Sequence, residues 1–357
     1  MSRPRVLLTG ATGYIAGQLL PAFRERYDLR LVDVRDTDAS GERVEGVEVV
    51  DVLSAEEAVL EPLFSDAEVV VHCGHFKPES EDPRSLYEGE RRNLDMMQRV
   101  YQLSLESGVR RVVAASTNQA AKWYERPYYA GIKDRVDPED YPRPDSFYGW
   151  AKAAYEPLGF LYACGSLGRK LEVVQIRIVV PREIDASLFE EEPPERYVRE
   201  LAGYISERDI QQLFCKSVET PGIEDEHGIP FHIFYGVSDN ARKVWSIINA
   251  RKVIGYTPED DSEIRFADDI AHIPPERKQT RDNRPGPPRL RRPRRREDAR
   301  FLRPARHPGV LPAAPRGRLA HARLPARRGR PLYRGVPGRA SPRPEPESGF
   351  YAPLPAH

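Results

Sequence analysis

The sequence predicts an α/β fold in which helices cover both faces of a doubly wound parallel sheet. Residues 1–273 alternate short β-branched runs with longer stretches of helical periodicity, and this order requires crossover connections between parallel strands. A glycine-rich turn joins the first of these strands to the first helix. With 357 residues, the chain can form two domains, or one large α/β domain with an appendage.

Six segments have the composition of buried strands, and a seventh is a candidate extension of the sheet. The six are 5–9, 29–34, 47–50, 68–72, 109–115 and 172–180, and the seventh is 231–235. Helical periodicity occurs near 14–26, 55–63, 85–107, 147–168, 195–218 and 241–252. These helices are long enough to form right-handed crossovers between successive parallel strands.

The chain changes character at Pro274, where the periodicity stops. Residues 274–357 contain 18 of the 34 prolines, and 22 Lys and Arg against 6 Asp and Glu. The segment thus has a formal charge of +16, which offsets −16 in residues 1–273. It cannot form a core, and three interpretations stay open: a disordered basic tail, an arm that binds polyanions, or the product of a frameshift in a GC-rich gene.

The cellular environment is indicated by the cysteines and the hydropathy. Cys73, Cys164 and Cys215 are odd in number and far apart, which argues against a disulfide framework and favours a reducing cytoplasm. The sequence has no long apolar leader and no run of about 18 apolar residues. We therefore expect neither export nor a membrane span.

The turn after the first strand has the glycine spacing of a dinucleotide-binding loop. Gly10 permits a tight strand-to-helix turn, and Gly13 lets the backbone approach a pyrophosphate. The small Ala16 or Gly17 allows the helix and the strand to pack closely. The N-terminus of the following helix would then face the negative charge.

Polar residues at the ends of the next strands extend this nucleotide site. Asp33 ends the second strand, where a carboxylate can accept both ribose hydroxyls and would repel a 2′-phosphate, so we expect NAD in preference to NADP. Arg30 and Arg35 lie close enough in sequence to weaken that preference. Asp51-Val52 would lie near the adenine, and the His72-Cys73-Gly74 segment near the ribose and pyrophosphate.

Tyr148 and Lys152 lie four residues apart and therefore on one face of a helix. A nearby ammonium stabilises a phenolate, so we expect it to lower the tyrosine pKa and favour acid–base chemistry. Tyr129 and Lys133 have the same spacing, but Gly131 and flanking turn signals indicate a loop. We therefore assign the catalytic role to Tyr148.

Hydroxyl side chains follow the fifth strand at the same edge of the sheet. Ser116 and Thr117 are followed by Asn118, and a hydroxyl here would complete a triad with the Tyr and Lys. The alternative is that Ser116 and Thr117 only cap a turn.

Together these motifs resemble the extended short-chain dehydrogenase/reductase family, also called the NAD-dependent epimerase/dehydratase family, over about residues 1–273. The resemblance implies a Rossmann-like fold, hydride transfer to a nicotinamide, Tyr148 as general base and Lys152 as a ribose-binding residue. It also favours Thr117 over Ser116 as the catalytic hydroxyl. The expected cofactor contacts are Gly10, Thr12, Gly13, Tyr14, Ile15, Asp33, Asp51, Val52, Cys73, Gly74, Tyr148 and Lys152.

A narrower resemblance is to uronate dehydrogenase-like proteins, through ASTNQ at 115–119, FYGWAK at 147–152 and YGVSDN at 235–240. It implies oxidation of a sugar or sugar acid, with Asn118 and Arg199 as substrate contacts. An arginine suits a carboxylate because its fork binds in a bidentate manner. The substrate-binding elements would begin at about residue 181.

Several positions depart from that narrower pattern: Gln119 replaces a usual His, Val179 replaces a usual Gly, and 181–200 is longer and acidic. If Glu190–Glu192 and Glu195 face the pocket, they would disfavour a uronate and suit a neutral sugar.

Two other functions stay open. One is an epimerase or dehydratase of a nucleotide sugar, for which the stretch after the sixth strand is short, and the other is a non-catalytic NAD-sensing protein. We expect a homodimer through the helices near 85–107 and 147–168, no membrane partner and no nucleic-acid partner for residues 1–273. Closely spaced His72, Cys73 and His75 lack a second ligand pair, so no metal is expected.

Overall fold

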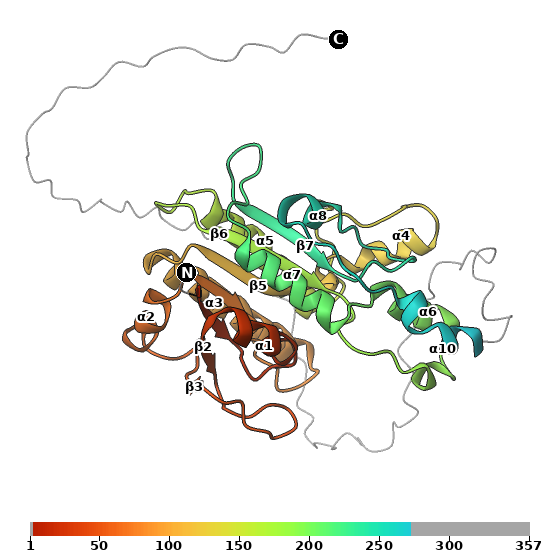
Figure 1. Cartoon of the computed structure of the whole chain (residues 1–357), viewed down its shortest axis with the longest axis horizontal. Helices are drawn as coiled ribbons and strands as arrows, with labels where there is room; N and C mark the ends of the chain where they lie inside the picture. Colours follow the sequence, from red (N-terminus) through yellow and green to blue (C-terminus); the bar gives the residue numbers. More distant parts are fainter. Residues whose placement is uncertain (1–2, 273–357) are drawn as a thin grey trace, which may run out of the picture. The chain divides into compact units, whose positions relative to one another are not determined.

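The computed structural model describes residues 3–272. Within this range, strands form one sheet in the order β3-β2-β1-β4-β5-β6-β7, and all neighbouring strands run parallel (Figure 1). Successive strands are added on one side of β1 up to β3 and on its other side from β4 onward, and this change of side confirms the doubly wound topology. The strands are β1 (Arg5–Thr9), β2 (Asp28–Asp33), β3 (Val47–Val49), β4 (Val69–His72), β5 (Arg111–Thr117), β6 (Glu172–Ile178) and β7 (Phe231–Gly236).

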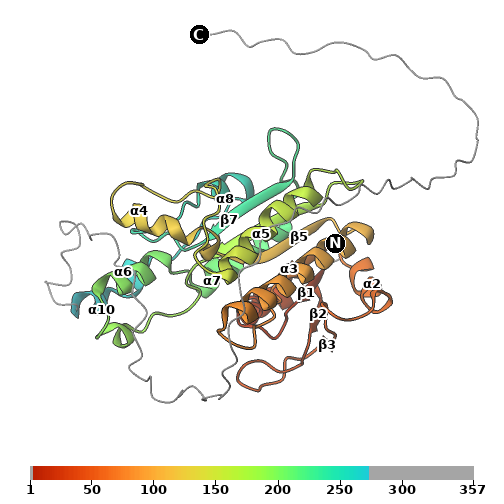
Figure 2. The same cartoon turned by 180° about the vertical axis from the view of Figure 1, so that it is seen from behind.

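Helices cover both faces of this sheet. Figure 1 shows α1 and α7 in front of it, and Figure 2, from behind, shows α3 and α5 in front. The longer helices are α1 (Tyr14–Arg26), α2 (Glu57–Ser65), α3 (Pro83–Glu106), α5 (Phe147–Ala163), α6 (Pro194–Gly203) and α7 (Glu207–Glu219). The shorter ones are α4 (Glu125–Tyr129), α8 (Ile248–Ile254), α9 (Ser262–Arg265) and α10 (Ala267–His272), with 3-10 turns at Asn118–Tyr124 and Ala186–Phe189.

The apolar core consists of separate clusters on the two faces. One cluster includes Phe23 of α1 and Leu213 of α7, and the other includes Leu63 of α2 and Tyr101 of α3. A third, smaller cluster packs α6 against residues after β6 and near α9; its buried members are Val180, Ile184, Tyr197, Leu201, Tyr204 and Phe266. This small cluster positions the segment after about residue 181 beside the strand ends.

The single helix expected over 195–218 is wrong, because the segment is broken between α6 and α7. Ile205 donates its main-chain N–H to the Val180 carbonyl oxygen at 3.0 Å, so residues 204–205 pair with the chain after β6. Ser206 then caps α7 by accepting from the Asp209 N–H at 3.3 Å. Gly203 and Ser206 are residue types that end and begin helices, but the helical periodicity continues across them and predicted a single helix.

The helix expected over 241–252 begins later, at Ile248. The preceding residues run alongside Val136, whose N–H donates to Val244 O at 2.8 Å and whose carbonyl accepts from Ser246 N at 2.9 Å. The helix expected to reach residue 168 also ends earlier, at Ala163. Pairing with Val136 therefore delays the start of α8, and a turn directly after Ala163 ends α5.

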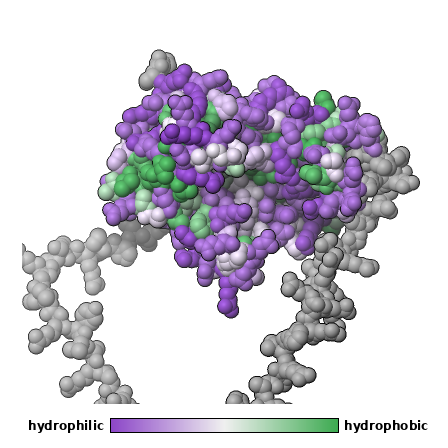
Figure 3. Space-filling view, turned by 90° about the horizontal axis from the view of Figure 1, so that it is seen from below, coloured by the Kyte–Doolittle hydropathy of each residue, from purple (hydrophilic) through white to green (hydrophobic). Residues whose placement is uncertain are grey.

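The predicted basic segment 274–357, with its three interpretations, lies outside the described residues. No helix within residues 3–272 is both long and apolar enough to span a membrane. The face in Figure 3 is mostly hydrophilic, with hydrophobic side chains gathered in separate patches.

Candidate active site

The glycine turn after β1 is built for close backbone approach. Gly10 has φ +73°, and a Cβ at this position would lie 2.4 Å from the main-chain N of Gly74. A Cβ on Gly13 would lie 3.1 Å from the Gly10 carbonyl oxygen. Both glycines thus hold a tight turn at the N-terminus of α1, where main-chain N–H groups can meet a pyrophosphate.

The close packing of α1 on the sheet depends on Ala16 and not on Gly17. Ala16 is fully buried, whereas a Cβ on the exposed Gly17 would meet nothing within 4 Å. The prediction named both residues, and the structure selects the alanine.

Asp33 faces the glycine turn from the end of β2. Its Oδ2 accepts from both the N–H (2.9 Å) and the hydroxyl (2.8 Å) of Thr12, and its Oδ1 accepts from Val34 N at 2.7 Å. These bonds fix the carboxylate beside the turn, as a diol-binding residue requires. Arg30 points instead to Glu48, with Nε 2.8 Å from Oε1, so it does not offer a charge for a 2′-phosphate at the Asp33 carboxylate.

Other expected cofactor residues are placed around the same strand ends. Ile15 and Cys73 line a pocket beyond the carboxyl ends of the central strands. The Tyr14 hydroxyl donates to the Pro181 carbonyl at 2.8 Å, so it ties α1 to the segment after β6. Asp51 accepts from Leu53 N at 2.9 Å and from the Ser54 hydroxyl, and therefore holds its own turn, while Val52 is buried.

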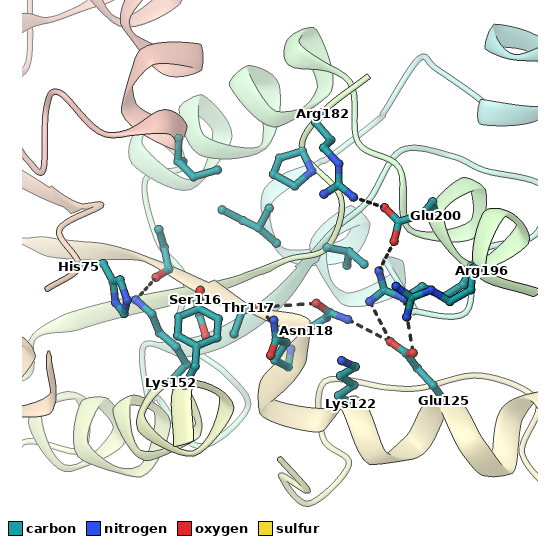
Figure 4. Close-up of a pocket in the computed structure, with 18 of the residues that line it drawn as sticks. His75, Ser116, Thr117, Asn118, Lys122, Glu125, Lys152, Arg182, Arg196 and Glu200 are labelled. Atoms are coloured by element: carbon teal, nitrogen blue, oxygen red, sulfur yellow. Dashed lines mark hydrogen bonds and ion pairs between the residues drawn. The ribbon is translucent and has the colours of Figure 1, made fainter. Parts of the chain in front are cut away.

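A pocket of about 590 Å³ opens beyond the carboxyl ends of β4, β5 and β6 (Figure 4). It brings together the predicted Thr117, Tyr148 and Lys152, and the predicted substrate residues Asn118 and Arg199. Several other residues line the pocket although no motif in the sequence marks them as site residues: His75, Lys122, Glu125, Tyr129, Pro181, Arg182, Arg196 and Glu200.

Tyr148 lies in the first turn of α5. Ser146 caps this helix by accepting from Gly149 N at 3.1 Å, and a Cβ on Gly149 would lie 2.5 Å from the Gln119 carbonyl oxygen. The helix start is therefore pressed against the residues after β5. Burial raises the pKa of Tyr148, and this effect is larger than the lowering by the neighbouring Thr117 hydroxyl.

The expected lowering of the Tyr148 pKa is therefore wrong for the protein alone. The Lys152 ammonium donates to the Ala115 carbonyl oxygen at 2.9 Å, and the side chain is deeply buried, with 4% exposed. Burial lowers the pKa of Lys152 to about 8. The lysine thus lies in the expected place, but burial of the phenol decides the direction of the tyrosine shift.

The two hydroxyls at the end of β5 have different surroundings. Thr117 Oγ1 accepts from Gln119 N at 3.3 Å and the residue lines the pocket together with Tyr148, so Thr117 both caps the turn and lies at the proposed triad. Ser116 Oγ is buried and has no hydrogen-bond partner among the described residues. Both residues line the pocket, which leaves a second hydroxyl near the reacting centre.

A network of hydrogen bonds and ion pairs connects the residues after β5 with α6 (Figure 4). Asn118 Nδ2 donates to Glu125 Oε1 at 3.2 Å, and Arg199 Nη2 donates to the same oxygen at 3.1 Å. Arg199 Nη1 also donates to Glu200 Oε1 at 3.0 Å, and Arg182 Nη2 donates to Glu200 Oε2 at 2.6 Å. Arg199 is thus in the pocket as expected, but between two carboxylates.

The acidic residues singled out from the sequence are only partly at the pocket. Glu195 lines it, whereas Glu190–Glu192 are not among its lining residues. The carboxylates that contact the arginine are Glu125 and Glu200, and their spacing in the sequence gave no signal of this pairing.

The two residues of the second Tyr/Lys pair, Tyr129 and Lys133, lie in different surroundings. Lys133 binds Asp140 at 2.9 Å, and residues 130–133 form a turn, as predicted. Tyr129, at the end of α4, nevertheless lines the pocket, and its hydroxyl is buried without a partner among the described residues.

The histidines beside β4 are neutral groups and do not form a metal site. Burial lowers the pKa of His72 to about 3 and that of His75 to about 4. The His75 ring packs edge-on to Tyr148 with centroids 5.3 Å apart. Across residues 3–272 no group of three His, Cys, Asp or Glu side chains could hold a metal ion.

Comparison with known proteins places this geometry in a family. The model of the NAD dependent epimerase/dehydratase family matches residues 6–164. An NAD-dependent glucose-6-phosphate dehydrogenase of Haloferax volcanii is 32% identical over 274 residues, which cover 73% of this chain and 95% of that protein. An L-arabinose 1-dehydrogenase (NAD(P)(+)) of the same organism is 29% identical, covering 72% and 97%.

A solved structure described as a mutated uronate dehydrogenase matches with a TM-score of 0.57 at 25% identity, covering 75% of this chain and 86% of that one. These relatives bear out the predicted Rossmann-like fold and the predicted class of NAD-dependent sugar or sugar-acid dehydrogenases. The chain belongs to the NAD-dependent epimerase/dehydratase family.

Proposed function

We propose that the protein is an NAD-dependent dehydrogenase that oxidises a CH–OH group of a sugar or sugar acid. The observation that carries this proposal is that the Tyr148 phenol, the Thr117 hydroxyl and the buried Lys152 ammonium line one pocket at the carboxyl end of β5. Two hydroxyls and a cation at one point suit removal of a proton from an alcohol.

The residues of the chain would divide the work as follows. The Thr117 hydroxyl would bind the substrate oxygen and orient it toward Tyr148. The deprotonated Tyr148 would take the proton from that oxygen as the carbonyl forms, which makes it the general base. Lys152 would hold a positive charge nearby and so favour the phenolate. Bound NAD would supply the acceptor for the hydride that leaves the carbon.

The nucleotide end of the pocket fits NAD. The Gly10–Gly13 turn lets main-chain N–H groups at the start of α1 meet a pyrophosphate, and this tight turn needs glycine because a Cβ at either position would press against backbone atoms. The Asp33 carboxylate, held beside the turn, would accept the ribose hydroxyls and repel a 2′-phosphate.

The test is NADH formation from a panel of aldoses, uronates and sugar phosphates by the full chain and by Tyr148→Phe. We expect the variant to lose about 100- to 10,000-fold in turnover while it binds NAD normally, because only the phenolic proton acceptor is removed. Tyr141→Phe is the control, since Tyr141 is 77% exposed and does not line the pocket. Normal turnover by Tyr148→Phe would overturn the base assignment. Tightly bound NAD with no net NADH, but with conversion of a nucleotide sugar, would favour the epimerase or dehydratase alternative.

The same proposal includes a homodimer in the cytoplasm. Aromatic and aliphatic side chains on α3 and α5 are exposed, among them Tyr87 (44%), Phe160 (47%) and Leu161 (43%). An apolar surface on two adjacent helices suits a partner that supplies the same surface. A monomeric mass by analytical ultracentrifugation at micromolar concentration would contradict the dimer.

A further inference from the structure

We propose that the substrate is an uncharged aldose, and that Glu125 determines this by occupying Arg199. The inference rests on the proposed dehydrogenase function and names the substrate class of the same site. It concerns the part of the pocket that α4 and α6 line, around the group of the sugar that does not react.

The strongest observation is that Arg199 is already paired on two sides. Its Nη2 lies 3.1 Å from Glu125 Oε1, and its Nη1 lies 3.0 Å from Glu200 Oε1. The side chain is 21% exposed, and its guanidinium lies 5.7 Å from the centroid of the Trp245 ring. Because both Nη groups already donate to carboxylates, Arg199 has no Nη pair free for bidentate binding of a substrate carboxylate.

A uronate would also meet unfavourable charge at this end. To reach Arg199, its carboxylate would have to lie beside Glu125 and Glu200, the two carboxylates that already hold this arginine. Glu125 and Glu200 have only 13% and 12% of their side chains exposed, so water screens them weakly. Binding a third carboxylate there would require Arg199 to leave one of its present partners, with a like-charge penalty.

The same groups suit the hydroxyls of a neutral sugar. Glu125 Oε1 already accepts two hydrogen bonds, whereas Oε2 has only a long contact of 3.5 Å with Arg199 Nε. Oε2 can therefore accept from a sugar hydroxyl.

The main rival substrate is a sugar phosphate, because two lining cations are less engaged than Arg199. Lys122 has no ion pair within residues 3–272, and Arg196, 68% exposed, lies 3.9 Å from Glu192. Both cations line the same pocket as Arg199, and its lining residues include more cations than carboxylates, so a phosphate bound near Lys122 and Arg196 would not need Arg199. The experiment therefore includes a phosphate.

The test uses sugars that share one ring and differ only at C6: glucose, glucuronate and glucose 6-phosphate, with galactose and galacturonate as a second set. We expect the full chain to use the aldose with a kcat/KM about tenfold or more above that of the matching uronate or phosphate. In Glu125→Gln, the ratio of uronate to aldose should rise by about tenfold, because Arg199 is released from one carboxylate. Glu200→Gln should move the ratio in the same direction.

Glu259→Gln is the matched control, because Glu259 pairs with Arg208 at 3.0 Å but does not line the pocket. Its ratio should equal that of the unchanged protein. A uronate or sugar phosphate used faster than the aldose would overturn the inference alone, as would an unchanged ratio in folded Glu125→Gln and Glu200→Gln. If NAD binds but no sugar yields NADH, both the inference and the proposed function fail.

Discussion

Lys152 donates a hydrogen bond from its buried ammonium to the main-chain carbonyl oxygen of Ala115 at 2.9 Å. Ala115 lies in β5 just before the two hydroxyl residues, so the lysine is anchored to the strand that ends in the triad. The charge is held where only 4% of the side chain is exposed, and burial lowers the pKa of Lys152 to about 8. A charged group is thus kept in place at a cost in folding free energy.

Replacing this lysine should therefore stabilise the fold and impair the reaction. At pH 7 we expect Lys152→Met to raise the free energy of unfolding by about 3 kcal/mol, since a pKa lowered from about 10.4 to about 8 penalises the charged form by that amount. Turnover should fall about 100-fold. Urea denaturation and NADH formation measure the two effects. A destabilised Lys152→Met protein would show that the bond to Ala115 outweighs the burial of the charge.

The stability gain should depend on pH in a defined window. Below pH 8, Lys152 is charged in both folded and unfolded chains, and the penalty is complete. Between pH 8 and about 10.4, the unfolded chain binds more protons than the folded chain, so the stability of the unchanged protein rises with pH. The advantage of Lys152→Met should therefore shrink across this window. Denaturation midpoints at pH 7 and pH 10 would show it, and an advantage that grows with pH would contradict the assigned shift.

Thr117 should influence the pH dependence of turnover through Tyr148. Burial raises the pKa of Tyr148, and the neighbouring Thr117 hydroxyl opposes that shift. Turnover should rise with pH above neutrality as the phenolate fraction grows, and Thr117→Val should move that rise to higher pH. Thr117→Ser keeps the hydroxyl and serves as the control. Profiles of kcat against pH with superimposable limbs for all three proteins would refute the coupling.

The sequence predicted the parts of this site that follow from local chemistry. The strand-turn-helix at Gly10 and Gly13, and the Tyr148/Lys152 spacing, depend on residues close together in the chain. The contact between Glu125 and Arg199 joins residues far apart, and no periodicity encodes it. The direction of the Tyr148 pKa shift was missed for a similar reason, because burial depends on every element around the pocket.

The broken helix shows how a non-local bond overrides a periodic pattern. Residues 195–218 have continuous helical periodicity, yet Ile205 pairs with Val180 after β6. Gly203 lies where a Cβ would be 2.6 Å from Val179 Cγ1, so close packing against the strand end requires a glycine there. Gly203 and Ser206 are local signals for a helix end and a helix start, but the chain breaks there because residues 204–205 pair with the segment after β6.

Two glycines of the nucleotide loop should respond in opposite ways to alanine. Gly10→Ala should lower the free energy of unfolding by more than about 1 kcal/mol and weaken NAD binding, because φ is +73° and the new Cβ would lie 2.4 Å from Gly74 N. Gly17→Ala should raise it by about 0.5–1 kcal/mol, since the position is helical and open. Thermal denaturation and NAD titration test the pair. Equal effects of both substitutions would refute the close approach at Gly10.

The buried pair of Glu156 and Arg177 should be a main support of the catalytic helix. Arg177, in β6, donates to Glu156 of α5 at 2.7 and 2.9 Å, and its third donor contacts the Tyr235 hydroxyl at 2.8 Å. Glu156→Gln leaves the buried guanidinium without a counter-charge, so we expect a loss of about 3–5 kcal/mol in the free energy of unfolding. The exposed pair of Glu48 with Arg30 at 2.8 Å is the control, and Glu48→Gln should cost less than about 1 kcal/mol. Urea denaturation measures both, and a loss below 1 kcal/mol for Glu156→Gln would mean that Tyr235 and the surrounding dipoles hold the charge of Arg177 unaided.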